Sequence, residues 1–351
     1  MKYKVKIILF LTVTTGFLSG CAKSTESDID TAVQKHINAK FPAEAEDACR
    51  TVFLKAQKNK TTSNQLCTAL KKRTDAELSI CEDEIQGSDF LNLVTDCKTD
   101  LIVRIEKIKT DRNVGIQTGL KNLNFKMPFE IQSRDVSLGY TAVTGDTKDK
   151  QVILSFDDGP HPLSKNVVAM LDQIGVKAHF MQVGQHVQQY PEITKMIADR
   201  GHSIGNHSWD HSDFSKISFQ EQIKQISDTN RIIINTIGWV DPFFRYPYGA
   251  TTPEMNKFLK DHSEVNFLWS VDSNDWRKIN ADLSLRTNQQ VVKETLEQLD
   301  QRGRGIVLFH DVHARTIELL PEFLIQLKIK GYTIVLLQAS DSGLKNSPRV
   351  P

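Results

Sequence analysis

From residue 151 onward, short apolar runs alternate with longer segments in which apolar residues recur every three to four positions. The short runs predict strands, and the longer segments predict amphipathic helices. The expected strands are VILSF, AHFMQV, HSIGN, FFRYP, VNFLWSV, GIVLF and TIVLL. The expected helices are VVAMLDQI, PEITKMIADR, FQEQIKQISDTNRIIINTI, VVKETLEQLD and IELLPEFLIQLKIK. This alternation predicts an α/β fold, a distorted and incomplete (β/α) barrel of about seven parallel strands.

The region before this alternation has a different pattern. Residues 28–111 contain a single glycine and a single proline, and their apolar residues lie at helical spacing. They predict three or four helices. Residues 112–148 are richer in glycine and polar residues, and FEIQSRDVSLGYTAV within them predicts a short β-hairpin. The expected divisions are a signal peptide (1–20), a helical region with four cysteines (21–112), a linker with the hairpin (113–148), a catalytic domain (149–340) and a tail (341–351).

The first 21 residues have the layout of an export signal. Three lysines precede an apolar stretch from Ile7 to Phe17, and the sequence LSGC follows and ends at Cys21. The apolar stretch is too short for a comfortable membrane span. LSGC resembles the bacterial lipobox, which predicts lipidation of Cys21 and a membrane-anchored lipoprotein in the periplasm or cell envelope. An ordinary cleaved signal is the alternative.

The other four cysteines all lie in the helical region: Cys49, Cys67, Cys81 and Cys97. An even number in an exported chain predicts two disulfides. If one helix runs from about residue 63 to 82, Cys67 and Cys81 are about 21 Å apart, beyond the reach of a disulfide. Hairpin geometry then favours Cys49 with Cys67 and Cys81 with Cys97. Metal binding by the four cysteines is the alternative, although no C-x-x-C pair is present.

Charge gives little indication of a partner. The 44 Lys and Arg residues nearly balance the 43 Asp and Glu residues, which leaves a net charge of +1. A nucleic-acid-binding protein usually carries a basic surface, so this class is disfavoured. We expect a monomer that binds no nucleic acid.

Polar residues of chemical interest follow the expected strands. They are Asp157 and Asp158, His207, Arg245 and Tyr248, Asp272, Asp275 and Trp276, and His310 and Asp311. In a (β/α) barrel the carboxyl ends of the strands meet at one face, so the fold would gather these side chains.

Within this group, His207 and His211 are four residues apart, which on one helical turn would place both imidazoles on the same side. Two histidines and one aspartate form the ligand set of a hydrolytic zinc site, which also accepts cobalt or nickel. Successive side chains of a strand point to opposite faces, so Asp157 and Asp158 could share a site only if the backbone turns. Gly159 and Pro160 provide that turn, which would let one carboxylate bind metal while the other acts as a base.

The sequence resembles the polysaccharide deacetylase family, the NodB-like carbohydrate esterases. The five motifs of that family occur in order as SFDDGP (155–160), HSWDH (207–211), RYPYG (245–249), DSNDW (272–276) and LFH (308–310). The resemblance covers about residues 150–337.

The resemblance implies a role for each matching residue. Asp158, His207 and His211 would bind a metal ion, expected to be Zn²⁺, and Asp157 would be the general base. Arg245 would keep Asp157 ionised, His310 would be the general acid, and Asp275 would keep its imidazolium charged. Tyr248 would donate its backbone N–H to the oxyanion, while Trp276 and Leu308 would line the acetyl pocket. His179 stands where the family usually has threonine and is expected to pack or line the site. His161, His186, His202 and His313 are not expected to be ligands, although His313 lies close to His310.

The expected function is hydrolysis of N-acetyl groups from an amino-sugar polymer. Envelope location makes peptidoglycan the first expected substrate, with chitin oligomers or poly-N-acetylglucosamine next and acetyl-xylan last. The alternative hypothesis, from another functional class, is a noncatalytic wall-binding or scaffold protein whose barrel only binds glycan.

Overall fold

The computed structural model describes residues 100–340 except 138 and 279–285. The strands are β1 (Phe129–Arg134), β2 (Thr141–Ala142), β3 (Gln151–Asp157), β4 (His179–Gln182), β5 (Ser203–Asn206), β6 (Phe243–Phe244), β7 (Val265–Phe267), β8 (Val271–Asp272), β9 (Gly305–His310) and β10 (Thr333–Ala339). The α-helices are α6 (Asp100–Asn122), α7 (Ser164–Ile174), α8 (Gly184–Gln189), α9 (Pro191–Asp199), α10 (Phe219–Ile237), α11 (Pro253–Asp261), α12 (Asn288–Arg302) and α13 (Ala314–Ile329). Two 3₁₀ turns are η1 (Phe214–Lys216) and η2 (Pro247–Gly249). The predicted export signal, Cys21 and the other four cysteines lie outside the described residues.

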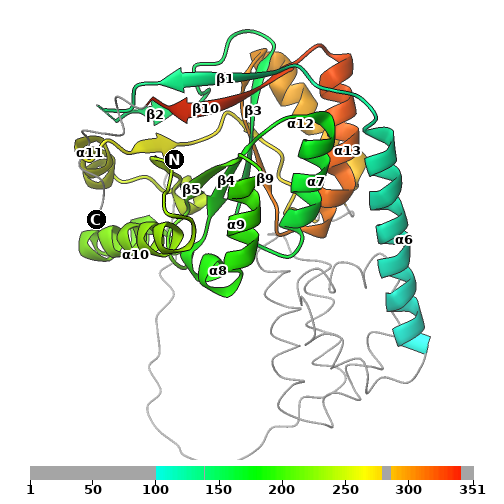
Figure 1. The fold of residues 1–351 in the computed structure, drawn as a ribbon, viewed down its shortest axis with the longest axis horizontal. Coiled ribbons are helices and arrows are strands. Elements are labelled where there is room, and N and C mark those ends of the chain that lie inside the picture. Colours follow the sequence, from blue (N-terminus) through cyan, green and yellow to red (C-terminus); the bar gives the residue numbers. More distant parts are fainter. Residues whose placement is uncertain (1–99, 138, 279–285, 341–351) are drawn as a thin grey trace, which may run out of the picture.

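All paired strands in the described sheet are parallel (Figure 1). Their order is β1-β10-β3-β4-β5-β6-β7-β2, and β9 pairs with both β3 and β8. Because β1 and β2 follow each other in the chain yet lie at opposite ends of this order, the sheet curls toward closure. The predicted parallel α/β barrel architecture is therefore confirmed.

Alternate residues of β3 face two different cores. On β3, Val152 and Leu154 belong to the core between the sheet and the helices, whereas Ile153 belongs to the smaller core inside the barrel. This is the two-residue period of a strand with both faces buried. The same period turns Asp157, four residues after Ile153, toward the inside of the barrel.

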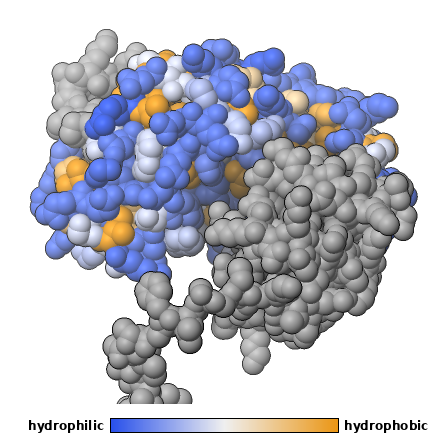
Figure 2. Space-filling view, turned by 90° about the horizontal axis from the view of Figure 1, so that it is seen from below, coloured by the Kyte–Doolittle hydropathy of each residue, from blue (hydrophilic) through white to orange (hydrophobic). Residues whose placement is uncertain are grey.

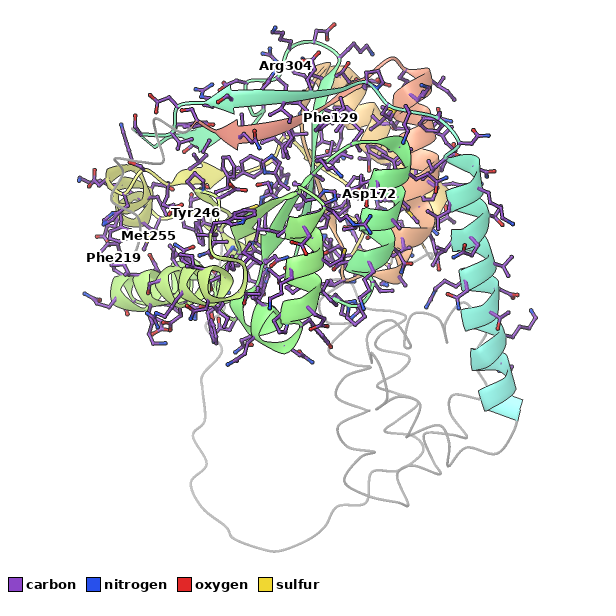
Figure 3. All side chains as sticks on the ribbon, in the orientation of Figure 1. Phe129, Asp172, Phe219, Tyr246, Met255 and Arg304 are labelled. Carbon is purple, nitrogen blue, oxygen red and sulfur yellow. The ribbon has the colours of Figure 1, made fainter. Side chains whose placement is uncertain are left out.

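The covering helices begin and end where the sequence supplies caps. α10 begins after Ser218, whose side chain accepts a hydrogen bond from the Glu221 N–H, and ends at Gly238 in a left-handed conformation. A satellite core beside α10 and α11 contains Tyr246 and Met255, and both are labelled with Phe219 in this part of Figure 3. These contacts fix the chain on either side of the η2 turn.

Several predictions about the organisation of the chain need correction. The expected hairpin does not form, because β1 pairs with β10 and β2 pairs with β7, each in parallel. α6 runs through the predicted boundary between residues 112 and 113 and packs beside α13 (Figure 1). The predicted linker thus supplies part of a helix and two strands of the sheet. Within the described part of the chain the sheet has ten strands rather than about seven, because it also includes β1 and β2 and because VNFLWSV divides into β7 and β8.

Hydrophobic residues are scattered over a largely hydrophilic surface on the face that Figure 2 shows. The described helices include none that combines the length and the apolar character required to cross a bilayer.

Candidate active site

The site begins at the carboxyl end of β3. Asp157 is the last residue of this strand, is 2 % exposed, and pairs in register with His310 at the end of β9. On β9, Ile306 faces the inner core, and His310 follows it by four residues on the same side of the strand. Strand pairing therefore places a carboxylate and an imidazole on neighbouring strands of one face.

A sharp turn separates Asp158 from Asp157. Asp158 has φ +71°, in the left-handed region that ordinary residues adopt rarely. Gly159 is packed so closely against Asp311 that an added Cβ would lie 2.6 Å from both oxygens of its carboxyl group. With any larger residue in place of glycine, either the buried Asp311 side chain or the turn itself would have to move. Burial raises the pKa of Asp311 to about 7.

His207 and His211 do not lie on a helix, which corrects the prediction of a helical turn. Residues 207–213 form a loop in which Ser208 and His211 have φ values of +69° and +61°. The Ser208 side chain accepts a hydrogen bond from the His211 N–H at 3.0 Å. This loop brings the two imidazoles to a centroid distance of 5.0 Å.

Asp158, His207 and His211 form a metal-ligand cluster within the described part of the chain. Oδ1 of Asp158 lies 3.4 Å from Nε2 of each histidine and, although buried, has no hydrogen-bond partner. Ligand atoms about 2.0–2.1 Å from a tetrahedral ion lie roughly 3.3 Å from one another, so these separations fit such an ion. Nδ1 of His207 donates to the Arg245 carbonyl at 2.8 Å, which leaves Nε2 to act as a ligand.

The ionisation state of Asp158 also suits a ligand. Burial raises the pKa of this carboxyl group, but His211, His207 and His310 outweigh burial and hold its pKa well below the usual range. The side chain is therefore a carboxylate, which is the form that binds cations.

Asp157 is fixed by Arg245. Nη1 of the fully buried guanidinium donates to Oδ1 of Asp157 at 2.5 Å, and its Nε donates to the Phe267 carbonyl at 2.7 Å. Oδ2 of Asp157 remains directed toward the site, 3.5 Å from Nε2 of His207. One carboxylate oxygen is thus held, and the other faces the cluster.

His310 is held by Asp275 on the opposite side. Its Nδ1 donates to Oδ1 of Asp275 at 2.7 Å, and its backbone N–H donates to Oδ2 at 2.8 Å. Thr316 donates its hydroxyl to the same Oδ2 at 2.5 Å, so the buried carboxylate is well satisfied. Burial lowers the pKa of His310, but Asp275 outweighs burial and raises this pKa to about 10. The imidazole is therefore protonated at neutral pH.

The other predicted residues lie around this centre. Tyr248, at φ +58° in η2, is 70 % exposed, and its ring lies 4.6 Å from that of His211. Trp276 directly follows Asp275 and is half-buried, and Leu308 is buried two residues before His310. His179 is buried between Phe243 and Phe267, so it is a packing residue.

Sequence reasoning missed some supporting contacts, although it had named Asp311 among the polar residues at the ends of the expected strands. Thr316 on α13 holds Asp275, and Asp311 packs on Gly159. Neither contact has a local sequence signal, because the partners are separated by 41 and 152 positions. His161, His186, His202 and His313 are not members of the cluster found among the described residues.

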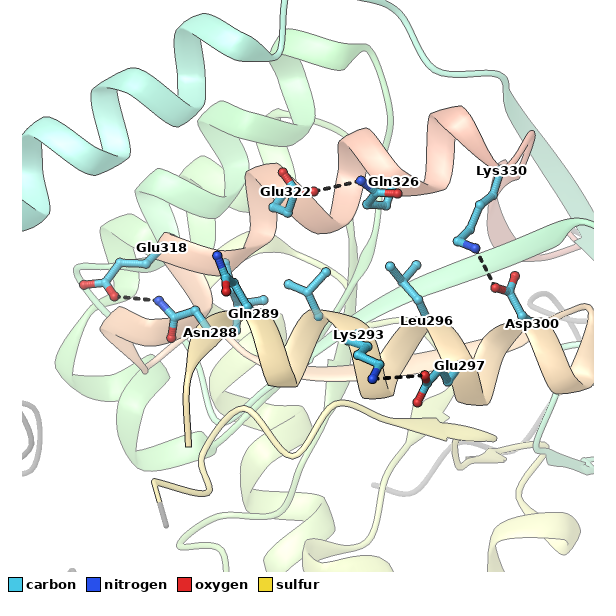
Figure 4. A pocket seen from close by; sticks show the side chains of 12 residues that line it. Asn288, Gln289, Lys293, Leu296, Glu297, Asp300, Glu318, Glu322, Gln326 and Lys330 are labelled. Carbon is cyan, nitrogen blue, oxygen red and sulfur yellow. Dashed lines mark hydrogen bonds and ion pairs between the residues drawn. The ribbon is translucent and has the colours of Figure 1, made fainter. Parts of the chain in front are cut away.

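A separate groove of about 780 Å³ lies between α12 and α13 (Figure 4). It is lined mainly by charged and amide side chains, which pair across it as Asn288 with Glu318 and Asp300 with Lys330. None of the residues of the cluster or of the two flanking pairs lines it.

Comparisons with known proteins show the family to which the chain belongs. The polysaccharide deacetylase family model matches residues 144–264. A peptidoglycan-N-acetylglucosamine deacetylase of Listeria monocytogenes is 35% identical over 191 residues, which is 54% of this chain and 38% of that protein. A peptidoglycan-N-acetylmuramic acid deacetylase of Bacillus subtilis is 33% identical over 193 residues, which is 55% of this chain and 39% of that protein. The chain thus spans about two fifths of the length of these curated relatives.

A solved structure extends the similarity over almost the whole chain. The peptidoglycan deacetylase Bd3279 of Bdellovibrio bacteriovorus is 30% identical, with a TM-score of 0.75, over 92% of this chain and 98% of that one. This chain belongs to the polysaccharide deacetylase family.

Proposed function

We propose that this protein is a metal-dependent hydrolase that removes N-acetyl groups from an amino-sugar polymer. The observation that carries the proposal is that a carboxylate and an imidazole, each fixed by its own ion-pair partner, lie beside one metal-ligand cluster. Asp157, held by Arg245, and His310, held by Asp275, end adjacent strands in register. Hydrolysis of an amide requires a proton to be removed from water and another to be given to the amine, and this pair can do both.

The proposed ligands of the metal ion are Asp158, His207 and His211. Zn²⁺ is the proposed ion, because two imidazoles and one carboxylate with positions left open are the usual donor set of hydrolytic zinc. A divalent ion there would supply a Lewis acid next to the acetamide carbonyl and the attacking water.

Asp157 and His310 would each carry out one of the two proton transfers. Oδ2 of Asp157 accepts a proton from the attacking water, because Oδ1 is already held by Arg245. The water oxygen bonds to the acetyl carbon, and the carbonyl electrons move to oxygen. His310 gives its proton to the amide nitrogen as the carbon–nitrogen bond breaks, since an amine anion is too basic to leave. The products are acetate and a free amine on the sugar.

Tyr248, Trp276 and Leu308, which lie around the proposed metal site, would bind and orient the acetyl group. The proposed donor to the oxyanion is the backbone N–H of Tyr248, in the η2 turn beside His211. Trp276 and Leu308 would form the apolar wall around the methyl group. Their position beside Asp275 and His310 supports this assignment.

Peptidoglycan is the proposed polymer. The relatives from Listeria and Bacillus are named for deacetylation of two different sugars of peptidoglycan, and the Bdellovibrio protein is also named a peptidoglycan deacetylase. Export and lipid anchoring at Cys21 remain part of this proposal and are supported by the LSGC sequence. The protein would then act on glycan strands at the cell envelope.

An acetate-release assay tests the proposal. The protein would be incubated with peptidoglycan, chitin oligomers, poly-N-acetylglucosamine and acetyl-xylan, each with Zn²⁺ and with a chelator. We expect acetate from peptidoglycan, loss of release on chelation, and loss in His207→Ala. Full release by the chelated protein would contradict the mechanism, and release from another polymer alone would contradict the substrate.

A further inference from the structure

The segment of residues 183–186, which follows β4 and forms the N-cap and first turn of α8, contacts both loops that carry the proposed metal ligands. On one side, the Val183 N–H donates to the Gly159 carbonyl at 2.9 Å. On the other side, the N–H groups of Gly184 and Gln185 donate to the carbonyls of Ser208 and Trp209, each at 2.9 Å. These three bonds join the turn after β3 to the loop after β5.

His186 adds the side-chain contact of this segment. Its Nδ1 lies 2.6 Å from the backbone carbonyl of Asp158. Because a carbonyl oxygen can only accept, Nδ1 carries the hydrogen. His186 therefore holds the peptide unit of the residue whose carboxylate is the proposed ligand.

The His186 contact is made to a residue with an unfavourable backbone conformation. Asp158 is in the left-handed region, at φ +71°, which for a non-glycine residue is sustained only by surrounding contacts. Without this contact the backbone at Asp158 could shift and carry with it Oδ1, which now lies 3.4 Å from Nε2 of both His207 and His211. The orientation of one ligand thus depends on a hydrogen bond from an element that supplies no ligand.

We propose that His186 is a positioning residue that fixes Asp158 relative to His207 and His211 through its Nδ1–H bond to the Asp158 carbonyl. The inference rests on the proposed metal site and assigns His186 no contact with the ion. Groups that orient a metal ligand typically change metal affinity about 10- to 100-fold when they are removed.

The test is a Zn²⁺ titration of the full chain in competition with a chromophoric chelator. We expect His186→Ala to weaken zinc binding about 10- to 100-fold. His186→Asn should restore it, because the Asn side-chain nitrogen is the same number of bonds from Cα as Nδ1 of His and can donate to the same carbonyl. The Co²⁺ absorption spectrum should change in His186→Ala and return in His186→Asn, which loss of packing alone would not produce.

His262→Ala is the matched control. His262 makes the same type of bond, from Nδ1 to the Phe258 carbonyl at 2.8 Å, at the end of α11. Its removal should leave zinc affinity unchanged. If His186→Ala does not fold, His186→Phe keeps a ring of similar size without the donor and should show the same weakening.

Two results would overturn the proposal. One is wild-type zinc affinity in a folded His186→Ala or His186→Phe variant, and the other is a loss that asparagine does not restore. Zinc affinity is measured without glycan, so a failure of the proposed deacetylase activity would leave this test unaffected.

Discussion

Arg245, which follows β6, and Asp157, which ends β3, form a buried ion pair, with Nη1 of the guanidinium 2.5 Å from Oδ1 of the carboxylate. The two side chains are 0 % and 3 % exposed. The backbone carbonyl of Arg245 also accepts the hydrogen bond from Nδ1 of His207. One residue therefore orients both the proposed base and a proposed ligand.

Removal of the arginine side of this pair should destabilise the fold. Arg245→Met leaves the Asp157 carboxylate buried without its charge partner, which typically costs about 3–5 kcal/mol. The free energy of unfolding from urea titration measures the loss. The double variant Asp157→Asn with Arg245→Met should recover part of it, since no buried charge is left unpaired. Equal stability of the single variant and the wild type would contradict the expected loss.

The Asp157→Asn variant distinguishes the proposed enzyme from a noncatalytic glycan-binding scaffold. An amide cannot accept the proton from water, so acetate release should fall about 100- to 10,000-fold. Zinc affinity should persist, because Asp157 is not a proposed ligand. Acetate release and zinc titration on the same preparation measure both. A noncatalytic protein would release no acetate even as wild type and would bind glycan equally well with either residue.

The Asp275–His310 pair should make stability depend on pH. Burial raises the pKa of Asp275, but His310 outweighs burial and lowers it, while Asp275 raises the pKa of His310 to about 10. A histidine whose pKa is higher in the folded state stabilises the fold fully below its ordinary value of 6.5, and this contribution declines as pH rises toward 10. The lowered carboxyl pKa contributes stability that is lost as pH falls below about 3.8.

The Asp275→Asn variant should reveal the pH range over which the Asp275–His310 pair stabilises the fold. Its deficit in free energy of unfolding should be about 3–5 kcal/mol near pH 6 and smaller at pH 9.5. Urea titrations of both proteins at the two pH values provide the measurement. A deficit that grows with pH would have the wrong sign for a protonated His310.

Gly184→Ala should destabilise the protein through overpacking. An added Cβ would lie 2.5 Å from Cε3 of Trp209, in the loop that carries His207 and His211, and 2.7 Å from Oγ1 of Thr229, which is buried on α10. Such a clash typically costs about 1–3 kcal/mol. Gly115, with nothing within 4 Å of its added Cβ, is the matched control, and Gly115→Ala should cause no comparable loss. Equal denaturation midpoints for Gly184→Ala and the wild type would contradict this packing.

Local sequence patterns predicted the elements that carry the site. The period of apolar residues gave α10 with both ends correct, since Ser218 and Gly238 are local caps. The apolar run before Asp157 gave β3. The same patterns missed α8 and α11 and assigned β1 and β2 to a hairpin, because short elements are defined largely by what they pack against.

The sequence by itself determined which chemical groups meet, because side chains at the carboxyl ends of parallel strands must gather at one face. It also determined that Asp157 and Asp158 could share a site only through a turn at Gly159. Only the tertiary structure decided how they share it. The register of β3 with β9 sets Asp157 beside His310, and the left-handed backbone at Asp158 and His211 directs two ligands toward each other. These geometries depend on contacts between residues far apart in the chain, such as Arg245 with Asp157 and His186 with Asp158, and no local pattern encodes them.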